Sequence, residues 1–450
     1  MLGRTAECYA DVVLPKLSRP GVRSFRGLRE SKMNNKATTF LAPLLMAMLL
    51  GACATTPTPT PSSAKHFDPQ RLGAISARFQ AEIDAGAFPG AYLLLVHDGQ
   101  VVYEKGLGVR DPKTGAPMTR DTIFRLYSMT KPLTSVAVMQ LVEAGRIGLH
   151  EPVSRYLPEL KGLKVGIEKR VGDGPRLELV DAEREINIQD LLTHTSGISY
   201  SGTRTLVMMQ YEEAKAGIND VRDNGDMVAK IARLPLMFHP GSGFEYGMST
   251  DVLGAMLERI SGKPLDQYLA ETILVPLKMH DSGFWVEPRN HGRMAEPFEK
   301  DPEGKPIKLI DRRSKPTMLG GGGGMVSTPH DYQRFLQMLL NGGELDGVRI
   351  LGLATVEFMA SNHLTGQKLP TNEFIWAGHG FGLGFMVRTD RGKARFNGSV
   401  GDYQWYGLGG TSFWVDPQER LIGLVVVQRQ GRAGAYNRLF RDMAYGAMRK

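Results

Sequence analysis

The stretch FRLYSMTKP, residues 124–132, places a serine and a lysine three positions apart, directly before a run of apolar residues with helical spacing. That spacing predicts a helix over 134–144, with the preceding residues in its first turn. Ser128 and Lys131 then lie on one face of the turn, where free backbone N–H groups and the positive end of the helix dipole favour an anion. Pro132 fits this position because proline costs little in a first turn.

A serine in this setting has two interpretations. The Lys131 amine can accept the proton of Ser128 and make the serine a nucleophile, provided that burial or neighbouring cations lower the pKa of the lysine. Alternatively, Ser128 is an ordinary helix N-cap and Lys131 is solvated. The spacing alone does not separate the two, because residues 62–65 read Ser-Ser-Ala-Lys in a segment with no predicted helix.

Short motifs elsewhere in the chain favour the nucleophile. They are the stretches 124–135, 141–145, 149–153, 191–197, 240–246, 276–279, 320–328 and 410–417, within a span of residues 70–445. In this order they resemble the serine β-lactamase and penicillin-binding-protein-like superfamily, and are most similar to class C β-lactamases and family VIII carboxylesterases. The resemblance implies an α/β (α+β) fold of β-lactamase/transpeptidase type, in which an antiparallel sheet flanked by helices joins an all-helical domain, with the site between them.

The second motif of that superfamily, Tyr-x-Asn, corresponds here to Tyr246-Gly247-Met248. The resemblance implies that Tyr246 shares a proton network with Ser128 and Lys131, in which either Tyr246 or Lys131 is the general base. Without the resemblance, Tyr246 would be interpreted as a packed aromatic side chain. Met248 takes the place of the asparagine and is expected to lie at the substrate, but it cannot hydrogen-bond a substrate amide as asparagine would, which argues against recognition of a β-lactam side chain.

The third motif, Lys-Thr-Gly, occurs literally at residues 113–115, but there it lies in a polar turn before the serine and is predicted to be a surface loop. Counting back from Gly410 places the equivalent at 405–407, where the chain reads Trp-Tyr-Gly. This form resembles the family VIII esterases.

The residues Trp405, Tyr406 and Gly407 are therefore expected to bind substrate, with an indole in place of a cation. No side chain there would bind the carboxylate of a penicillin, which favours neutral acyl esters. The resemblance also implies that the backbone N–H groups of Ser128 and Leu408 form an oxyanion hole. The competing interpretation of Trp405 is a core aromatic residue on a strand.

Strand signals at both ends of residues 66–450, with helical spacing between them, imply one sheet built from both ends of the chain. We expect an α/β part at about 66–127 and 310–450 and a helical part at about 134–309. The charged segment 161–184 is predicted to be a surface hairpin or insertion. Helices are predicted around 71–83, 134–144, 188–193, 212–231, 250–260, 265–274 and 434–448, and strands around 91–96, 101–105, 382–389, 395–398, 411–415 and 421–427.

The N-terminal residues resemble a bacterial lipoprotein leader. The apolar run 40–52 is too short to span a bilayer and ends in Leu-Gly-Ala-Cys, with Cys53 as the residue to be lipidated. We expect 1–32 to be a non-native upstream extension, 33–52 the signal peptide and the Pro/Thr-rich 53–65 a tether. These features predict a lipid-anchored protein in the bacterial cell envelope that faces the periplasm; the alternative is an uncleaved apolar tail.

Composition excludes several functions. The net charge is +8, but residues 1–52 hold eight Lys/Arg and three Asp/Glu, so that +5 belongs to the leader and only +3 to the rest, and no nucleic-acid partner is expected. The ten histidines show no metal-ligand spacing, so neither a metal nor a cofactor is expected, and His194 is interpreted as structural. The glycine run 320–324 lacks the Lys-Ser/Thr of a phosphate loop and predicts close backbone approach beside the site.

The expected function is that of a serine hydrolase that cleaves carboxyl esters of small molecules through an acyl-enzyme on Ser128. A first alternative is a β-lactamase or D-amino-acid peptidase, acting on β-lactam-like substrates. A second is a catalytically silent, membrane-tethered binding protein that keeps the fold.

Overall fold

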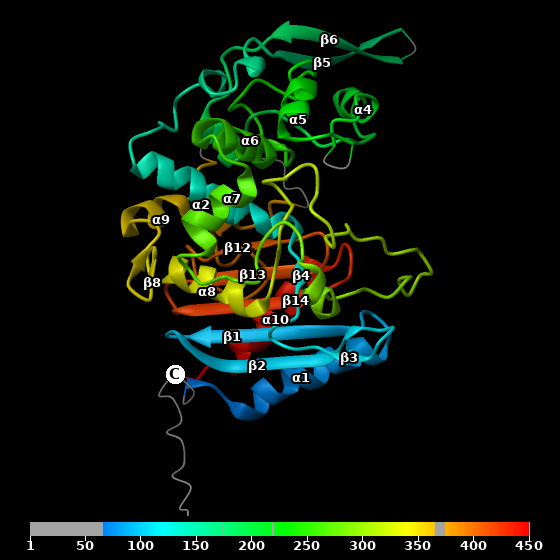
Figure 1. Cartoon of the computed structure of the whole chain (residues 1–450), viewed down its shortest axis with the longest axis vertical. Helices are drawn as coiled ribbons and strands as arrows, with labels where there is room; N and C mark the ends of the chain where they lie inside the picture. Colours follow the sequence, from blue (N-terminus) through cyan, green and yellow to red (C-terminus); the bar gives the residue numbers. More distant parts are fainter. Residues whose placement is uncertain (1–65, 173, 218–219, 365–373, 450) are drawn as a thin grey trace, which may run out of the picture. The chain divides into compact units, whose positions relative to one another are not determined.

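The computed structural model describes residues 66–172, 174–217, 220–364 and 374–449 (Figure 1). The predicted upstream extension, signal peptide, Cys53 and tether lie outside the described residues and stay predictions. No helix in the described ranges is both long enough and apolar enough to cross a bilayer.

The core of the fold is an antiparallel sheet of eight strands in the order β10-β11-β12-β13-β14-β1-β2-β3. β1 from the N-terminal side pairs with β14 from the C-terminal side, so both ends of the chain build one sheet, as the strand pattern predicted. β1 and β2 form a hairpin whose turn residues Asp98 and Gly99 both have positive φ, at 49° and 73°. The strands are β1 Gly90–His97, β2 Gln100–Asp111, β3 Ala116–Pro117, β10 His379–Phe381, β11 Met386–Arg388, β12 Tyr403–Tyr406, β13 Thr411–Asp416 and β14 Leu421–Val427.

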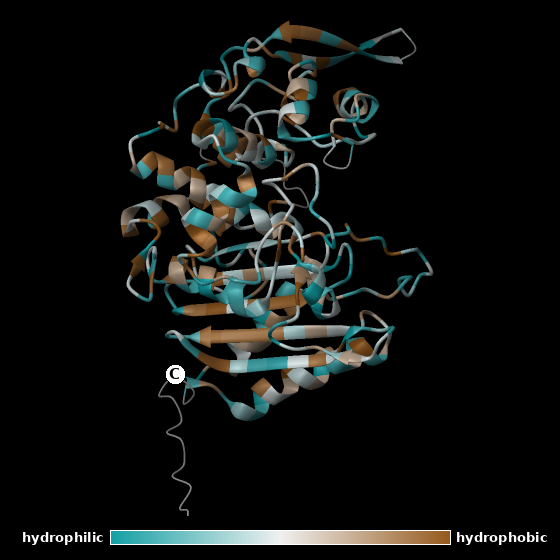
Figure 2. Ribbon diagram, in the orientation of Figure 1, coloured by the Kyte–Doolittle hydropathy of each residue, from teal (hydrophilic) through white to brown (hydrophobic). Residues whose placement is uncertain are grey.

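One face of the sheet is covered by two helices from opposite ends of the chain, α1 Pro69–Asp84 and α10 Ala433–Ala447 (Figure 1). Phe79, Phe440 and Trp414 are fully buried between these helices and the strands. Figure 2 shows hydrophobic residues concentrated along strands such as β1, as expected for strands covered on both faces. The other face packs against the main core, which includes α8 Pro329–Leu340 and the helical part.

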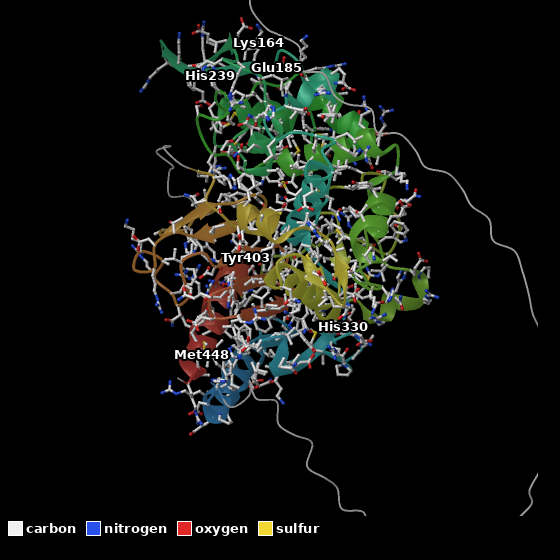
Figure 3. The ribbon with its side chains drawn as sticks, turned by 90° about the vertical axis from the view of Figure 1, so that its left-hand side faces the viewer. Lys164, Glu185, His239, His330, Tyr403 and Met448 are labelled. Atoms are coloured by element: carbon white, nitrogen blue, oxygen red, sulfur yellow. The ribbon has the colours of Figure 1, made fainter. Side chains whose placement is uncertain are left out.

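The helical part consists mainly of short helices. It also holds a two-stranded hairpin of β5 Lys164–Val171 and β6 Gly174–Asp181, so this part is mainly helical rather than all-helical, and the hairpin predicted within 161–184 is confirmed. Figure 3 labels Lys164 on this hairpin and Met448 just beyond α10, at opposite ends of the view. The remaining elements are α2 Thr130–Glu143, α3 Ile188–Leu192, α4 Leu206–Glu213, α5 Asn224–Ile231, α6 Ser249–Ser261, α7 Leu265–Leu269, α9 Leu353–Met359, and the short pairs β4 Phe124–Arg125 with β7 Val326–Ser327 and β8 Glu344–Leu345 with β9 Val348–Arg349.

Two predicted elements were wrong, and a third, the strand expected over 382–389, is confirmed only at 386–388, because residues 382–385 form the turn between β10 and β11. The helix expected over 212–231 is broken into α4 and α5, because Lys215 adopts a left-handed φ of 49° and the Asp223 side chain caps a new helix by accepting from the Asp226 N–H at 2.8 Å. No strand forms at 395–398. The carbonyls of Phe396 and Asn397 instead accept hydrogen bonds from the Arg388 guanidinium, at 3.0 and 2.9 Å.

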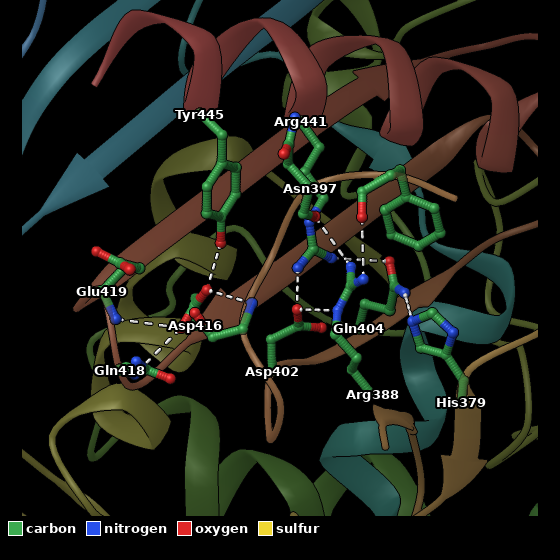
Figure 4. Close-up of polar contacts among 12 residues, drawn as sticks. His379, Arg388, Asn397, Asp402, Gln404, Asp416, Gln418, Glu419, Arg441 and Tyr445 are labelled. Atoms are coloured by element: carbon green, nitrogen blue, oxygen red, sulfur yellow. Dashed lines mark hydrogen bonds and ion pairs between the residues drawn. The ribbon is translucent and has the colours of Figure 1, made fainter. Parts of the chain in front are cut away.

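A buried ion cluster joins β12 to α10 (Figure 4). Asp402, just before β12, accepts a hydrogen bond from Arg388 Nε at 2.6 Å and another from Arg441 of α10, and all three side chains have no exposed surface. Gln404 of β12 accepts from Arg441 at 3.3 Å and contacts His379 at 3.1 Å. Because side chains alternate along a strand, the cluster fixes β12 from the face opposite to Trp405.

Candidate active site

The nucleophile candidate lies at the entry to α2. Ser128 is partly exposed in a 3₁₀ turn, Tyr127–Met129, that continues directly into the helix. Tyr127 adopts a left-handed φ of 47°, which turns the chain from β4 into this helix. The Tyr127 hydroxyl accepts a hydrogen bond from the Ile310 N–H at 2.8 Å and so anchors the turn. Ser128 is thereby presented at the start of a buried helix, as the sequence predicted.

Lys131 is fully buried, and its amine points back toward the serine. Lys131 Nζ donates hydrogen bonds to the Gly322 carbonyl at 2.7 Å, the Tyr200 hydroxyl at 3.1 Å and Ser128 Oγ at 3.4 Å. The interpretation of Lys131 as a solvated surface residue is therefore wrong. Sequence reasoning missed Tyr200. This residue follows the 191–197 motif by three positions and could have been found by extending that motif to the next titratable side chain.

Tyr246 comes from the segment before α6 and packs against the same amine. Its ring centre lies 4.6 Å from Lys131 Nζ and 5.3 Å from the ring of Trp405. Burial raises the pKa of the Tyr246 phenol, while the nearby Ser128 hydroxyl and Trp405 indole act to lower it. Within the described part of the chain, neither the Tyr246 hydroxyl nor the Trp405 indole N–H has a well-directed hydrogen bond. The structure thus brings Ser128, Lys131 and Tyr246 together, but the phenol bonded to Lys131 is that of Tyr200.

The glycine run behind the lysine approaches α6 closely. The Gly322 N–H donates to Asp251 Oδ1 at 2.9 Å, and a Cβ at Gly322 would lie 2.4 Å from the other carboxylate oxygen. Burial raises the pKa of Asp251, and the neighbouring Lys131 acts in the opposite direction. The predicted close approach at 320–324 is confirmed, and the loop links the Lys131 amine to a buried carboxylic acid that the sequence analysis did not single out.

β12 and the loop after it lie beside Tyr246 and form a further part of the candidate site. Trp405 is 1% exposed on the sheet, so the interpretation of this residue as a core aromatic is confirmed, and it also contacts Tyr246. Tyr406 stacks on Trp405 with ring centres 5.1 Å apart. A Cβ at Gly407 would lie 2.1 Å from the Leu126 carbonyl, so only glycine lets this loop lie against the nucleophile segment. Leu408, half-exposed, follows directly.

The proposed oxyanion donors are available in this geometry. Across the residues that the structure describes, the backbone N–H groups of Ser128 and Leu408 donate to no other residue. Such unpaired donors beside a nucleophile can bind the oxygen of a reacting carbonyl.

Two other candidate residues, Met248 and His194, are packed in the protein core. Met248 is fully buried in the main core at the N-cap of α6, so its side chain offers a substrate no polar group. His194 is also fully buried, and its Nδ1 accepts from the Gly247 N–H at 3.4 Å. Burial and the neighbouring Lys131 hold the pKa of His194 well below its ordinary value, which keeps the imidazole neutral. The Lys-Thr-Gly of 113–115 lies in the turn between β2 and β3, as predicted.

The described ranges contain no group of three His, Cys, Asp or Glu side chains placed to hold a metal ion. A serine hydroxyl lies within reach of a buried amine and beside two phenols, and the backbone N–H groups of Ser128 and Leu408 have no acceptor among the described residues. This constellation defines a serine enzyme of acyl transfer.

The chain belongs to the beta-lactamase family, whose model matches residues 75–447. Protein Rv1367c of Mycobacterium tuberculosis is 36% identical over 357 residues, covering 77% of this chain and 87% of that protein. Esterase EstB of Burkholderia gladioli is 30% identical over 428 residues, covering 85% and 99%. The solved structure of EstCE1, described as a hydrolase with promiscuous acyltransferase activity, superposes with a TM-score of 0.67 at 28% identity and covers 84% of this chain and 98% of its own.

These findings confirm the superfamily and the antiparallel-sheet fold predicted from the motifs. The protein is an enzyme, a serine hydrolase of the β-lactamase type.

Proposed function

We propose that the enzyme hydrolyses carboxylic esters of small molecules through a covalent acyl-enzyme on Ser128. The observation that carries the proposal is the contact of 3.4 Å between Lys131 Nζ and Ser128 Oγ. The Lys131 amine that makes this contact is fully buried and also faces the ring of Tyr246. The name of the relative Esterase EstB supports esters as the substrate class, and the description of EstCE1 as a hydrolase supports hydrolysis.

In the first step Ser128 Oγ bonds to the acyl carbon while its proton passes to Lys131. Burial raises the pKa of Tyr246, which disfavours a phenolate and supports Lys131 as the base. The C–O bond to the leaving alcohol then breaks, the neutral Tyr246 phenol gives that oxygen its proton, and Lys131 returns a proton to the phenol. The N–H groups of Ser128 and Leu408 bind the negative oxygen of the tetrahedral intermediate.

In the second step water replaces the alcohol. A water molecule attacks the acyl carbon and gives its proton to Lys131, the bond to Ser128 Oγ breaks, and that proton passes to Oγ, which releases the carboxylic acid and restores the serine.

The preference for esters over β-lactams rests on the wall opposite the nucleophile. By the motif count, Trp405 takes the place of the lysine that would pair with a substrate carboxylate, and Met248 is buried in the core instead of offering an amide. A penicillin carboxylate would therefore be desolvated beside Trp405 without a cation from this position.

The test compares p-nitrophenyl butyrate with nitrocefin for the full-length chain and for Ser128→Ala. We expect ester turnover with kcat/KM at least about a hundredfold above that for nitrocefin, and a loss of at least about a thousandfold in Ser128→Ala, since the nucleophile is indispensable to the acyl-enzyme. Comparable turnover of nitrocefin would favour the β-lactamase alternative. Absent turnover together with failure of a fluorophosphonate probe to label Ser128 would favour the silent binding protein.

Acyl transfer to an alcohol is a second candidate, favoured by the acyltransferase activity in the description of EstCE1. The same acyl-enzyme serves both reactions, because an alcohol takes the place of water in the second step. Product analysis with vinyl butyrate and an added primary alcohol tests it: a new ester supports transfer, and butyric acid alone refutes it.

The location also remains a proposal. We propose that Cys53 is lipidated and holds the enzyme at the cell envelope, facing the periplasm, on the strength of the leader pattern alone. Fractionation of cells that express the full chain and the Cys53→Ala variant tests this: the wild type belongs with membranes and the variant in the soluble fraction. Equal distribution of both would contradict the anchor.

A further inference from the structure

The two tyrosines beside Lys131 come from two chain segments that lie against each other. Tyr200 ends the segment 198–200, and Tyr246 lies in the segment 245–247. A Cβ at Gly247 would lie 2.2 Å from the Ile198 carbonyl, so the two backbones are in direct contact at a position that only glycine allows.

A side-chain contact joins the residues that directly precede the two tyrosines. Ser199 is fully buried, and its hydroxyl donates to Glu245 Oε1 at 3.0 Å. The charged and titratable groups that face the Glu245 carboxylate are Arg204 at 3.7 Å, which is 66% exposed, and the buried phenol of Tyr211. Burial raises the pKa of Glu245, and the Ser199 hydroxyl and Arg204 lower it.

We propose that Glu245, acting through Ser199, is a positioning residue that sets the separation of Tyr200 and Tyr246, whose ring centres lie 5.9 Å apart beside the Lys131 amine. The inference rests on the proposed function, because it concerns the geometry of that proton network. Neither Glu245 nor Ser199 touches the reacting atoms; the contact fixes the two backbones from which the phenols project.

The geometry around the amine shows why this separation matters. Lys131 Nζ is bonded to the Tyr200 hydroxyl at 3.1 Å and lies 4.6 Å from the centre of the Tyr246 ring. If either segment shifts, the amine follows Tyr200 or loses its packing against Tyr246, and its contact of 3.4 Å with Ser128 changes. Displacements of about 1 Å at such a network can cost about a hundredfold in rate.

A purely structural contact between two loops would affect only stability. A positioning contact lowers kcat while leaving KM nearly unchanged, because the residues expected to bind substrate, Trp405, Tyr406 and Gly407, belong to β12 and the residue after it and are not substituted. The two members also act as one unit, so their effects on rate are not additive.

The experiment uses the full-length enzyme with p-nitrophenyl butyrate and measures kcat, KM, their pH profiles and the melting temperature. The variants are Ser199→Ala, Glu245→Ala, the double alanine variant and Glu245→Gln, with Arg204→Ala as the matched control that removes only the exposed partner. We expect each single alanine variant to lose about tenfold in kcat with KM within twofold, and the double variant to lose no more than the worse single one.

Glu245→Gln keeps an oxygen that accepts from Ser199, so we expect its kcat to stay within about threefold of the wild type, and that of Arg204→Ala within about twofold. The alkaline limb of the kcat profile should shift in Ser199→Ala, because the proton network itself is altered, and stay in place in Arg204→Ala.

A Ser199→Ala variant that folds, melts below the wild type and keeps kcat within twofold would overturn the proposal and leave a structural contact only. Additive losses in the double variant would also overturn it. If Glu245→Ala does not fold, the kcat of Ser199→Ala decides the test, since this variant removes only one hydroxyl and is the milder change. Failure of the proposed function is distinguishable, because Ser128→Ala would then keep the wild-type rate.

Discussion

Replacing each of the two site tyrosines with phenylalanine separates stability from catalysis. Tyr246→Phe removes a buried hydroxyl that has no well-directed hydrogen bond among the described residues, so no such bond is lost. An unsatisfied buried hydroxyl carries a desolvation cost of about 1–3 kcal/mol, so the free energy of unfolding should stay the same or rise. Tyr200→Phe removes the partner of Lys131 at 3.1 Å and should lower the free energy of unfolding by about 1 kcal/mol.

For kcat we expect the opposite order, with the larger loss in Tyr246→Phe and the smaller loss in Tyr200→Phe. In the proposed mechanism Tyr246 delivers the proton to the leaving alcohol, and a positioned general acid contributes about 10²- to 10⁴-fold. Tyr246→Phe should therefore lose at least about a hundredfold in kcat. Tyr200→Phe leaves that donor in place and disturbs only the orientation of Lys131, so a loss of about tenfold is expected.

Initial rates with p-nitrophenyl butyrate and urea unfolding on the same preparations measure both quantities. The reasoning fails if Tyr200→Phe loses more in kcat than Tyr246→Phe, because Tyr200 would then carry the proton. It also fails if both variants stay within threefold of the wild type, because neither phenol would then take part.

Three further predictions concern stability and the glycine loop. Asp402→Ala leaves two fully buried guanidinium groups without their carboxylate and should lower the free energy of unfolding by about 3–5 kcal/mol in urea titrations, whereas a loss under 1 kcal/mol would contradict the cluster's role. Gly322→Ala places a Cβ 2.4 Å from the Asp251 carboxylate and should cost at least about tenfold in kcat through the displaced Lys131 partner; unchanged kcat would show that the loop yields freely. Burial lowers the pKa of His379 to about 4 and that of His194 well below 6.5, so below pH 6.5 the unfolded chain binds more protons than the folded one. The free energy of unfolding should therefore keep its highest value above pH 6.5 and fall on acidification by up to about 1.4 kcal/mol per pH unit for each imidazole. A free energy of unfolding that does not change from pH 7 to 5 would refute this.

Local periodicity was sufficient to predict much of the fold. The hairpin of β1 and β2, the helix α2 and the C-terminal helix carry strong spacing and turn signals, and the structure forms all of them. The expected helix over 212–231 was wrong because helical spacing continues across the break, and only the left-handed Lys215 and the new N-cap show that the chain turns. The expected strand at 395–398 was wrong because a buried arginine bonds two of its carbonyls.

The candidate site was predictable where one turn of helix fixes it. The i, i+3 spacing determines that Ser128 and Lys131 share a face, and the contact of 3.4 Å follows from it. The partners of Lys131 depend on tertiary packing, which spacing does not encode. Tyr200 and Gly322 reach the amine from loops about 70 and 190 residues away, so a motif identifies the neighbourhood and not the hydrogen bond.

The segment that carries Ser128 and the loop 407–410 after β12 are held together by close backbone approach and by side-chain contacts. The Leu126 carbonyl lies where a Cβ of residue 407 would be, and it accepts a hydrogen bond from the Thr411 hydroxyl at 3.2 Å. A Cβ at Gly409 would contact the ring of Tyr127 at 2.9 Å, while the Gly409 carbonyl accepts from the Arg429 N–H at 2.7 Å. Because both ends of the loop rest on the segment that carries Ser128, we expect a displacement of this loop to move the Ser128 hydroxyl and the proposed anion donor, the Leu408 N–H, together. The close approach of the two segments thus depends on two glycines, Gly407, which the motif register singled out, and Gly409, which it did not.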